Sequence, residues 1–290
     1  MNRSKSKPLL WAFVVVVASA AVAGAYAMVM SRSQALLLAR HPLPASTVVA
    51  LTTPQAIAEG EHLVTVTACA GCHGADLTGG PLQVAGTQDY TSNLTRALRR
   101  LSDADIDRAL RRGLRPDGSS ELVMPSQAYA TFTDAEMAAI IGYLRGLPPT
   151  GTEPPKPTPG LLLRASLLMG GLRTADDKVA RARPPVDAGA AFESGRHLAA
   201  VACGRCHGTD LGGIREAGSD MTVRGYYSRA RFHTLLRKGD VIGEGNTKLM
   251  SDTAQASFSH FTDAEIDALY DYLYARDRIL AARRAAPTPR

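Results

Sequence analysis

All four cysteines of the 290-residue chain stand in two short segments that share one pattern. The segments are Cys69-Ala70-Gly71-Cys72-His73 and Cys203-Gly204-Arg205-Cys206-His207, and both read C-x-x-C-H. Two thiols three positions apart on one helical turn can each add across a vinyl group of haem, and the next residue can bring its imidazole to the iron. The pattern therefore predicts two covalently attached c-type haems, with His73 and His207 as iron ligands.

Paired cysteines also occur in redox-active disulfides, in zinc knuckles and in structural disulfides. None of these uses requires a histidine directly after the second cysteine, and here such a histidine is present twice. Haem attachment is therefore the favoured interpretation of both segments.

The length and composition of the chain limit the number of domains and the classes of binding partner. The chain has room for about two ordinary domains. Its apolar content of 45% is normal, whereas its aromatic content of 6% is low, so a large apolar cofactor would help to form each small core. The net charge of +6 comes with no aromatic-interleaved basic stripe, and we expect no binding to nucleic acid.

The first 30 residues predict a membrane anchor. Basic residues precede an uncharged run from Leu9 to Met30, which is long enough to cross a bilayer at about 1.5 Å per residue. A cleaved signal peptide is the alternative, since Ala25-Tyr26-Ala27 offers a cleavage site, but the apolar core of a signal peptide is usually shorter. We favour an uncleaved single-pass anchor.

The leading basic residues favour a cytoplasmic N-terminus, so that everything after Ser31 would be exported. The expected location is the bacterial inner membrane, with the haem domains in the periplasm. This fits the haem prediction, because c-type haem is attached outside the bacterial cytoplasm.

The chain contains an internal repeat that extends beyond the two cysteine segments. Three pairs of segments match in order along the chain: 59–63 with 195–198, 73–77 with 207–211, and 132–136 with 261–265. One residue of slippage separates the first pair from the second. The repeat indicates two related halves, each with one haem site.

Helix signals dominate both halves. The segments beginning at Thr133 and Thr262 are capping boxes, and a third box begins at Ser102 and opens a helix that Gly113 ends. Thr53 is expected to cap the first helix of the first half, and Asp187 to play that part in the second. Apolar residues recur at helical spacing after the boxes at Thr133 and Thr262, so the fold class is predicted to be all-α.

The resulting division has six parts. They are an anchor (1–30), a tether (31–52), a first domain (53–147), a linker (148–186), a second domain (187–280) and a flexible tail (281–290). Within the Pro-rich linker, Leu161 to Leu172 is apolar but too short to span a bilayer, and Arg164 interrupts it. We expect it to pack on one domain or between them, with a second membrane contact as the alternative.

The sixth ligand of each iron decides between electron transfer and catalysis. In the first half the candidates are Met124 and Met137. Met137 lies on the apolar face of a helix, where packing explains it. Met124 follows a loop and precedes Pro125, which would stiffen the segment that presents the sulfur, and it is the preferred ligand.

In the second half, aligning Gly113 with Gly239 places Met250 opposite Met124. Met250 is therefore the preferred sixth ligand there. The remaining candidates in this half are Met221, His233 and His260.

These motifs resemble those of a membrane-anchored dihaem cytochrome c, with two class I cytochrome c domains in tandem. The resemblance covers about residues 53–147 and 187–276. It implies that the first and last helices of each domain cross near the haem, that the methionine loop closes the far side, and that one haem edge stays exposed. The second half departs from the family pattern at Ser251, where a proline would be expected.

With His and Met ligands the expected role is a membrane-tethered electron carrier rather than an enzyme. Its partners would be redox proteins, within or beside a membrane oxidoreductase complex. One alternative is a dihaem cytochrome c peroxidase, which needs one iron that can open to peroxide. Another is the cytochrome subunit of a membrane dehydrogenase.

A cluster of arginines in the first half bears on partners. We expect most of them to form a solvated helix face offset by Asp103, Asp105 and Asp107. The alternatives are docking to an acidic partner or pairing of one arginine with a haem propionate. The cluster consists of Arg96, Arg99, Arg100, Arg108, Arg111, Arg112 and Arg115.

Overall fold

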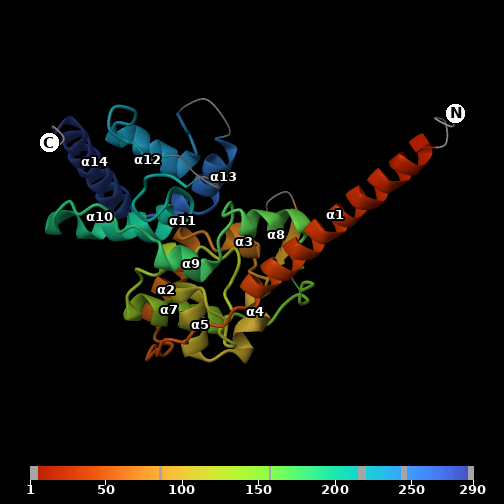
Figure 1. Cartoon of the computed structure of the whole chain (residues 1–290). Coiled ribbons are helices and arrows are strands. Elements are labelled where there is room, and N and C mark those ends of the chain that lie inside the picture. Colours follow the sequence, from red (N-terminus) through yellow and green to blue (C-terminus); the bar gives the residue numbers. More distant parts are fainter. Residues whose placement is uncertain (1–5, 85–86, 157, 215–219, 243–246, 287–290) are drawn as a thin grey trace.

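The computed structural model describes residues 6–84, 87–156, 158–214, 220–242 and 247–286. Figure 1 shows two groups of helices that contact each other, with one long helix projecting away from them. The fold is mostly helical, as predicted, and the described residues also contain one small β-hairpin.

The projecting helix is α1 (Ser6–Leu37). From Leu10 onward it is long and apolar enough to cross a membrane, and none of its most apolar window is buried against the rest of the chain. It continues seven residues beyond Met30, so the first part of the predicted tether is helical. The rest of the tether lies on the first half, where the Leu51 N–H donates to Ala138 O (3.0 Å) and Val48 is buried.

The first half begins where Thr53 caps its first helix, as predicted, by accepting a hydrogen bond from the Ala56 N–H (3.3 Å). Ser102 and Thr133 open their helices with the predicted capping boxes, and Gly113 ends α5 in a left-handed conformation (φ 68°). The elements are α2 (Pro54–Val66), α3 (Ala70–His73), β1 (Gly80–Val84), β2 (Thr87–Thr91), α4 (Leu94–Ala97), η1 (Leu98–Arg100), α5 (Asp103–Arg112), α6 (Ser126–Tyr129) and α7 (Asp134–Gly146).

The hairpin was not predicted. β1 and β2 pair antiparallel, with Gly80 opposite Thr91 and Val84 opposite Thr87. It follows the first cysteine segment after the loop of residues 74–79, and the Thr91 hydroxyl donates to Cys72 O (2.8 Å). The hairpin therefore braces the turn that carries the cysteines.

The second half repeats this plan without a hairpin in its described residues. Its elements are η2 (Ala190–Phe192), α10 (Glu193–Leu198), the π-helical turn η3 (Ala199–Cys203), α11 (Gly204–His207), α12 (Arg229–Lys238), α13 (Lys248–Ala256), η4 (Phe258–His260) and α14 (Asp263–Ala285).

Two expectations for the second half were wrong. Asp187 does not cap a helix: it accepts the Gly189 N–H (2.8 Å) in a turn, and α10 begins only at Glu193. The predicted flexible tail (281–290) begins as helix, because α14 continues to Ala285. The Arg276 side chain is 1% exposed and donates to backbone carbonyls of the second half, which holds this part of the helix in place. Residues 287–290 of the predicted tail lie outside the described part.

The first and last helices of each half cross in close contact, as the family resemblance implies. A Cβ on Gly60 of α2 would lie 2.1 Å from Ala139 O of α7, and a Cβ on Gly195 of α10 would lie 2.0 Å from Ala268 O of α14. Only glycine lets the backbones approach this closely. The two crossings are equivalent in the repeat.

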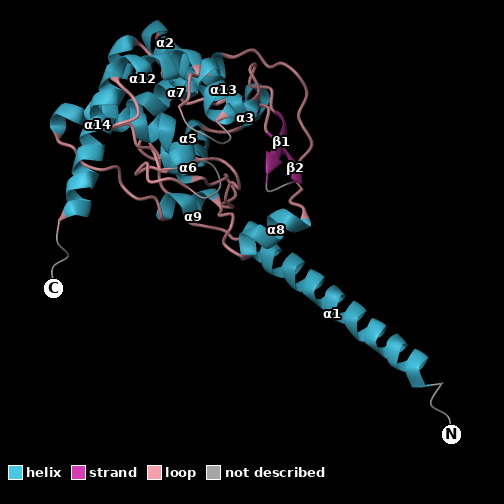
Figure 2. Cartoon of the chain, turned by 90° about the horizontal axis from the view of Figure 1, so that it is seen from above, coloured by secondary structure: helices cyan, strands magenta, loops and turns pink. Residues whose placement is uncertain are grey.

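The linker contains α8 (Leu161–Leu168) and α9 (Ala175–Ala180). In Figure 2, α8 lies across the end of α1. It packs on the first half, as one of the two placements predicted, through a small apolar cluster that joins Leu163 and Leu167 to Val84 and Leu122. Arg164 donates to Ser33 Oγ of α1 (3.0 Å). The linker thus ties the long helix to the first half.

Candidate haem sites and the interface between them

Each C-x-x-C-H segment forms a single helical turn, α3 in the first half and α11 in the second. The loops that follow have matching backbones. Gly74 and Gly208 have φ values of 81° and 79°, and Leu77 and Leu211 both adopt φ 59°. The N–H of Gly79 donates to His73 O (2.7 Å), as that of Gly213 donates to His207 O (2.8 Å). The two segments are therefore the same structure built twice.

The chemistry of the thiols separates haem attachment from the alternatives. None of the four cysteines forms a disulfide bond. Burial raises the pKa of Cys69, and it raises the pKa of Cys203 to about 12. A redox-active C-x-x-C needs a lowered thiol pKa, so these turns do not resemble one. Within the described ranges, no three His, Cys, Asp or Glu side chains converge as metal ligands, which gives a zinc knuckle no support.

His73 is oriented by the segment after the hairpin. Its Nδ1 lies 2.9 Å from Ser92 O, which fits a donated N–H and leaves the lone pair of Nε2 for another partner. Burial lowers the pKa of His73, favouring the neutral ring that binds metal. This donor set suits a haem iron.

Met124 lies in the irregular segment just before α6, whose N-cap is Pro125. Its side chain is partly buried against the core of the first half. Met137, by contrast, is 0% exposed within α7, where packing accounts for it.

Met250 lies on α13 rather than in a loop, and it packs against the core of the second half. Gly239, which supported the alignment with Gly113, ends α12 in the same left-handed conformation (φ 73°). The two methionines therefore follow equivalent helix ends but stand on different local structures.

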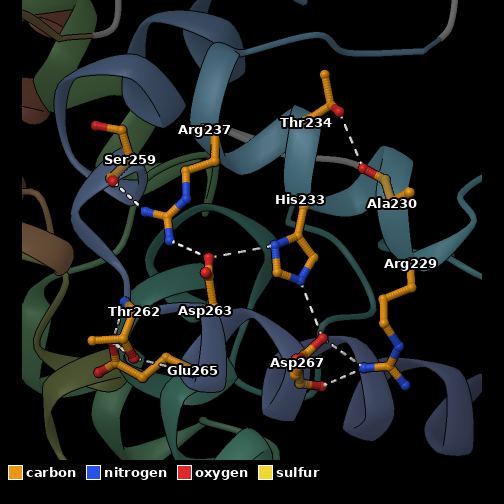
Figure 3. A network of polar contacts seen from close by, with 10 residues as sticks. All are labelled: Arg229, Ala230, His233, Thr234, Arg237, Ser259, Thr262, Asp263, Glu265 and Asp267. Carbon is orange, nitrogen blue, oxygen red and sulfur yellow. Dashed lines mark hydrogen bonds and ion pairs between the residues drawn. The ribbon is translucent and has the colours of Figure 1, made fainter.

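The other candidates in the second half have different surroundings. Figure 3 shows His233 between two carboxylates, with Nε2 3.1 Å from Asp267 and Nδ1 3.7 Å from Asp263, so both ring nitrogens face the ion pairs that join α12 to α14. His260 is exposed in η4. The Met221 side chain packs on the core of the second half, and the Met221 carbonyl accepts a hydrogen bond from Arg276.

The two halves meet in a reciprocal interface. His62 Nε2 of the first half lies 2.8 Å from Glu265 Oε1 of the second, and His197 Nε2 of the second lies 2.7 Å from Glu136 Oε1 of the first. These are equivalent residues in the repeat. The halves are thus arranged as the two subunits of a symmetric dimer would be.

The apolar part of the interface is reciprocal as well. Val66 belongs to the core of the second half, and Val201 belongs to the core of the first. Both are buried completely and stand just before the cysteine turns. The Phe132 ring also contacts the edge of the His197 ring, with centroids 6.3 Å apart. Docking of the halves therefore brings the two cysteine turns toward each other.

Arg205 joins the cysteine turns directly. It stands between Cys203 and Cys206, and its Nη1 donates to Ala68 O (2.8 Å), the carbonyl next to Cys69. A Cβ on Gly71 would lie 3.5 Å from its Nη2. One cation thus contacts both attachment sites.

Comparison with known families identifies both halves. Residues 57–148 match the family described as Cytochrome c, and residues 190–273 match the family described as Cytochrome C oxidase, cbb3-type, subunit III. The chain carries two cytochrome c domains in tandem. This tandem cytochrome binds covalently attached c-type haem and transfers electrons with it, and its N-terminal apolar helix supports membrane anchoring. A search of curated proteins found no match.

The arginines of the first half of this tandem cytochrome serve its own fold. Arg108 pairs with Asp105 (2.6 Å) and Arg111 with Asp107, so the predicted offset of charges is present. The predicted solvated face is not, because these four side chains are only 7–20% exposed. Asp103 pairs instead with Arg145 (2.6 Å). Arg96, Arg99 and Arg100 bind residues 147–153 at the start of the linker. These contacts favour a structural role over a docking patch.

Sequence patterns did not single out the interface residues of the tandem cytochrome. His62, His197 and both glutamates lie in the repeated segments, and the repeat was the available signal. Each glutamate has a sufficient local explanation in its capping box, so a partner in the other half could not be inferred from the sequence.

Proposed function

We propose that the chain is a membrane-tethered electron carrier that holds two c-type haems, one in each half, and passes single electrons between them. The proposal rests above all on the contact of the two cysteine turns through Arg205. Because each turn would tether one haem, cofactors attached there would lie within one short relay. The bound haems would supply reversible one-electron chemistry, and this chain supplies their spacing.

We propose His73 and Met124 as the axial ligands in the first half, and His207 and Met250 in the second. Supporting this, His73 is held neutral with Nδ1 engaged, and both methionines sit at the edges of the two cores. Two protein ligands on each iron would keep it six-coordinate in both oxidation states, so that little rearranges on electron transfer. Such a site has no open position for peroxide.

We propose that α1 anchors the chain in the bacterial inner membrane and that both haem domains lie in the periplasm. The length and apolar surface of α1 support the anchor, and the basic residues before it favour this orientation. The match of the second half to a subunit of a cbb3-type cytochrome oxidase supports redox partners in a respiratory complex.

The haem content and the spectrum of the purified full-length chain test this proposal. We expect two covalent haems per chain that survive denaturation, and an oxidised spectrum with the weak Met-to-Fe(III) band of both sites. A high-spin haem with rapid peroxide turnover would instead support the peroxidase alternative. Absence of covalent haem would overturn the proposal altogether. If two haems are found, purification of the native membrane complex would identify the electron donor and the electron acceptor.

A further inference from the structure

The first inference concerns the exposed face of α8. This helix buries Leu163 and Leu167 against the first half, yet it leaves Leu161 48% exposed and Leu162 62% exposed, and Met169, directly after it, is 79% exposed. Three large apolar side chains on one short segment are unusual for a surface in water.

The position of α8 along α1 indicates what covers this face. Arg164 of α8 binds Ser33, three residues beyond the uncharged run that ends at Met30, which is about 4.5 Å along the helix axis. The headgroup layer on each side of the hydrocarbon is about 5–8 Å thick. With α1 across a bilayer, α8 therefore lies at headgroup depth, next to the apolar surface of α1.

We propose that Leu161, Leu162 and Met169 insert into the lipid surface of the bilayer that α1 spans, so that α8 is a second, interfacial membrane contact. This rests on the proposed anchor. A helix lying in the interface buries its apolar face at the boundary of headgroups and acyl chains. It would hold the first half against the membrane surface.

Thiol labelling in vesicles tests the lipid contact. With the four native cysteines bound to haem, Leu162→Cys introduces the reactive thiol, and Leu249→Cys, 55% exposed in the second half, is the matched control. In phosphatidylethanolamine–phosphatidylglycerol vesicles, a charged maleimide should react about tenfold more slowly at 162 than at 249, since lipid excludes the charged reagent from the thiol. A lipophilic maleimide should show no such difference.

Equal rates at both positions in protein that floats with the vesicles would overturn the α8 contact and leave the anchor intact. Protein that does not float with the vesicles would overturn the anchor itself.

A second and independent inference concerns Arg205. Its guanidinium is partly buried between the two cysteine turns, and no carboxylate of the described ranges forms an ion pair with it. Its charge is permanent. The guanidinium lies against Gly71 of the opposite turn, where a Cβ would be 3.5 Å from its Nη2.

A fixed positive charge acts on the redox equilibrium of any iron nearby. Oxidation adds one positive charge to the iron, and a neighbouring cation opposes that change, more strongly where water is excluded. We propose that Arg205 raises the reduction potentials of both haems and so couples the two sites electrostatically. This deepens the proposed relay and rests on it.

Replacement of the charge tests this role. Arg205→Met should lower both midpoint potentials in a spectroelectrochemical titration of the full chain, whereas Arg205→Lys should stay close to the parent. Unchanged potentials in Arg205→Met, with two haems and both Met bands retained, would overturn the inference. Equal shifts in the Met and Lys variants would also overturn it, since they would assign the effect to packing.

Where Arg205→Met does not acquire haem, Arg205→Gln provides the uncharged variant. A parent chain that lacks two covalent haems would overturn the proposed function rather than this inference.

Discussion

Glu265 binds His62 across the interface with one carboxylate oxygen and caps its own helix with the other. Oε1 lies 2.8 Å from His62 Nε2, while Oε2 accepts the Thr262 N–H (2.7 Å). Glu136 is used in the same way, with His197 and Thr133. The capping box thus fixes the rotamer of the side chain that reaches the other half.

The docking of the two halves should depend on pH. The hydrogen bond with Glu265 raises the pKa of His62 above its ordinary 6.5. For a raised pKa, the contribution to stability is complete below the unfolded-state value and is lost as the pH rises through the folded-state value. Burial acts to raise the pKa of Glu265 and Glu136, but the bonds to histidine and to the capping residues outweigh it and lower both below the ordinary 4.5.

For these carboxylates the contribution is present above 4.5 and is lost as the pH falls through the lowered value. Denaturant unfolding as a function of pH should therefore show the best docking between about 4.5 and 6.5, with a decline on either side. His62→Gln should flatten the alkaline decline. An unchanged profile in that variant would contradict the assignment.

Two substitutions should separate the interface role of Glu265 from its capping role. Glu265→Gln keeps an acceptor for the Thr262 N–H but loses the ion pair, and for a partly exposed pair we expect a loss below about 1 kcal/mol. Thr262→Ala removes the cap, with a loss of about 1 kcal/mol. Glu265→Gln should weaken both the acid and the alkaline decline, whereas Thr262→Ala should leave the alkaline decline, which depends on His62, in place. Glu136→Gln is the matched variant in the other half and should behave alike.

Alanine at the helix crossings should destabilise both halves. In Gly60→Ala and Gly195→Ala the new Cβ meets the carbonyls of Ala139 and Ala268, so the helices must move apart, at a loss of about 1–3 kcal/mol. Gly146→Ala, at the end of α7 with nothing within 4 Å, should be neutral or stabilising. Thermal unfolding measures the stability of the three variants. An unchanged stability in Gly60→Ala would show that α2 and α7 are farther apart at their crossing than described.

The axial methionines should each account for part of the Met-to-Fe(III) band. Met124→Ala and Met250→Ala should each remove about half of its intensity, since each iron loses one thioether. Met137→Leu and His233→Gln should leave the band intact, because Met137 fills the core and His233 faces Asp263 and Asp267. Loss of the band in His233→Gln would reassign the second site.

The parts of the fold that depend on neighbouring residues followed from the sequence. The caps at Thr53, Ser102, Thr133 and Thr262 all formed as expected, because a capping box is complete within four residues. The repeat likewise predicted matching turns at both cysteine segments. The assigned haem and methionine residues remain predictions.

The features that the sequence did not reveal depend on distant contacts. β1 begins with Gly80 and Pro81, which weaken any strand signal, and the segment becomes a strand only because β2 pairs with it. The extension of α14 depends on Arg276 reaching the carbonyls of Asp210, Leu211 and Met221. Such contacts become visible only when the chain has folded.

The reciprocal interface also has a consequence for assembly. Two separate copies related in this way would part on dilution, whereas here one polypeptide joins them, so their encounter is intramolecular and independent of protein concentration. Fusion also frees each half from having to match the other, and the residues at 71 and 205 already differ between equivalent turns. A nearly symmetric arrangement of the two halves can thus hold two cysteine turns that differ in sequence.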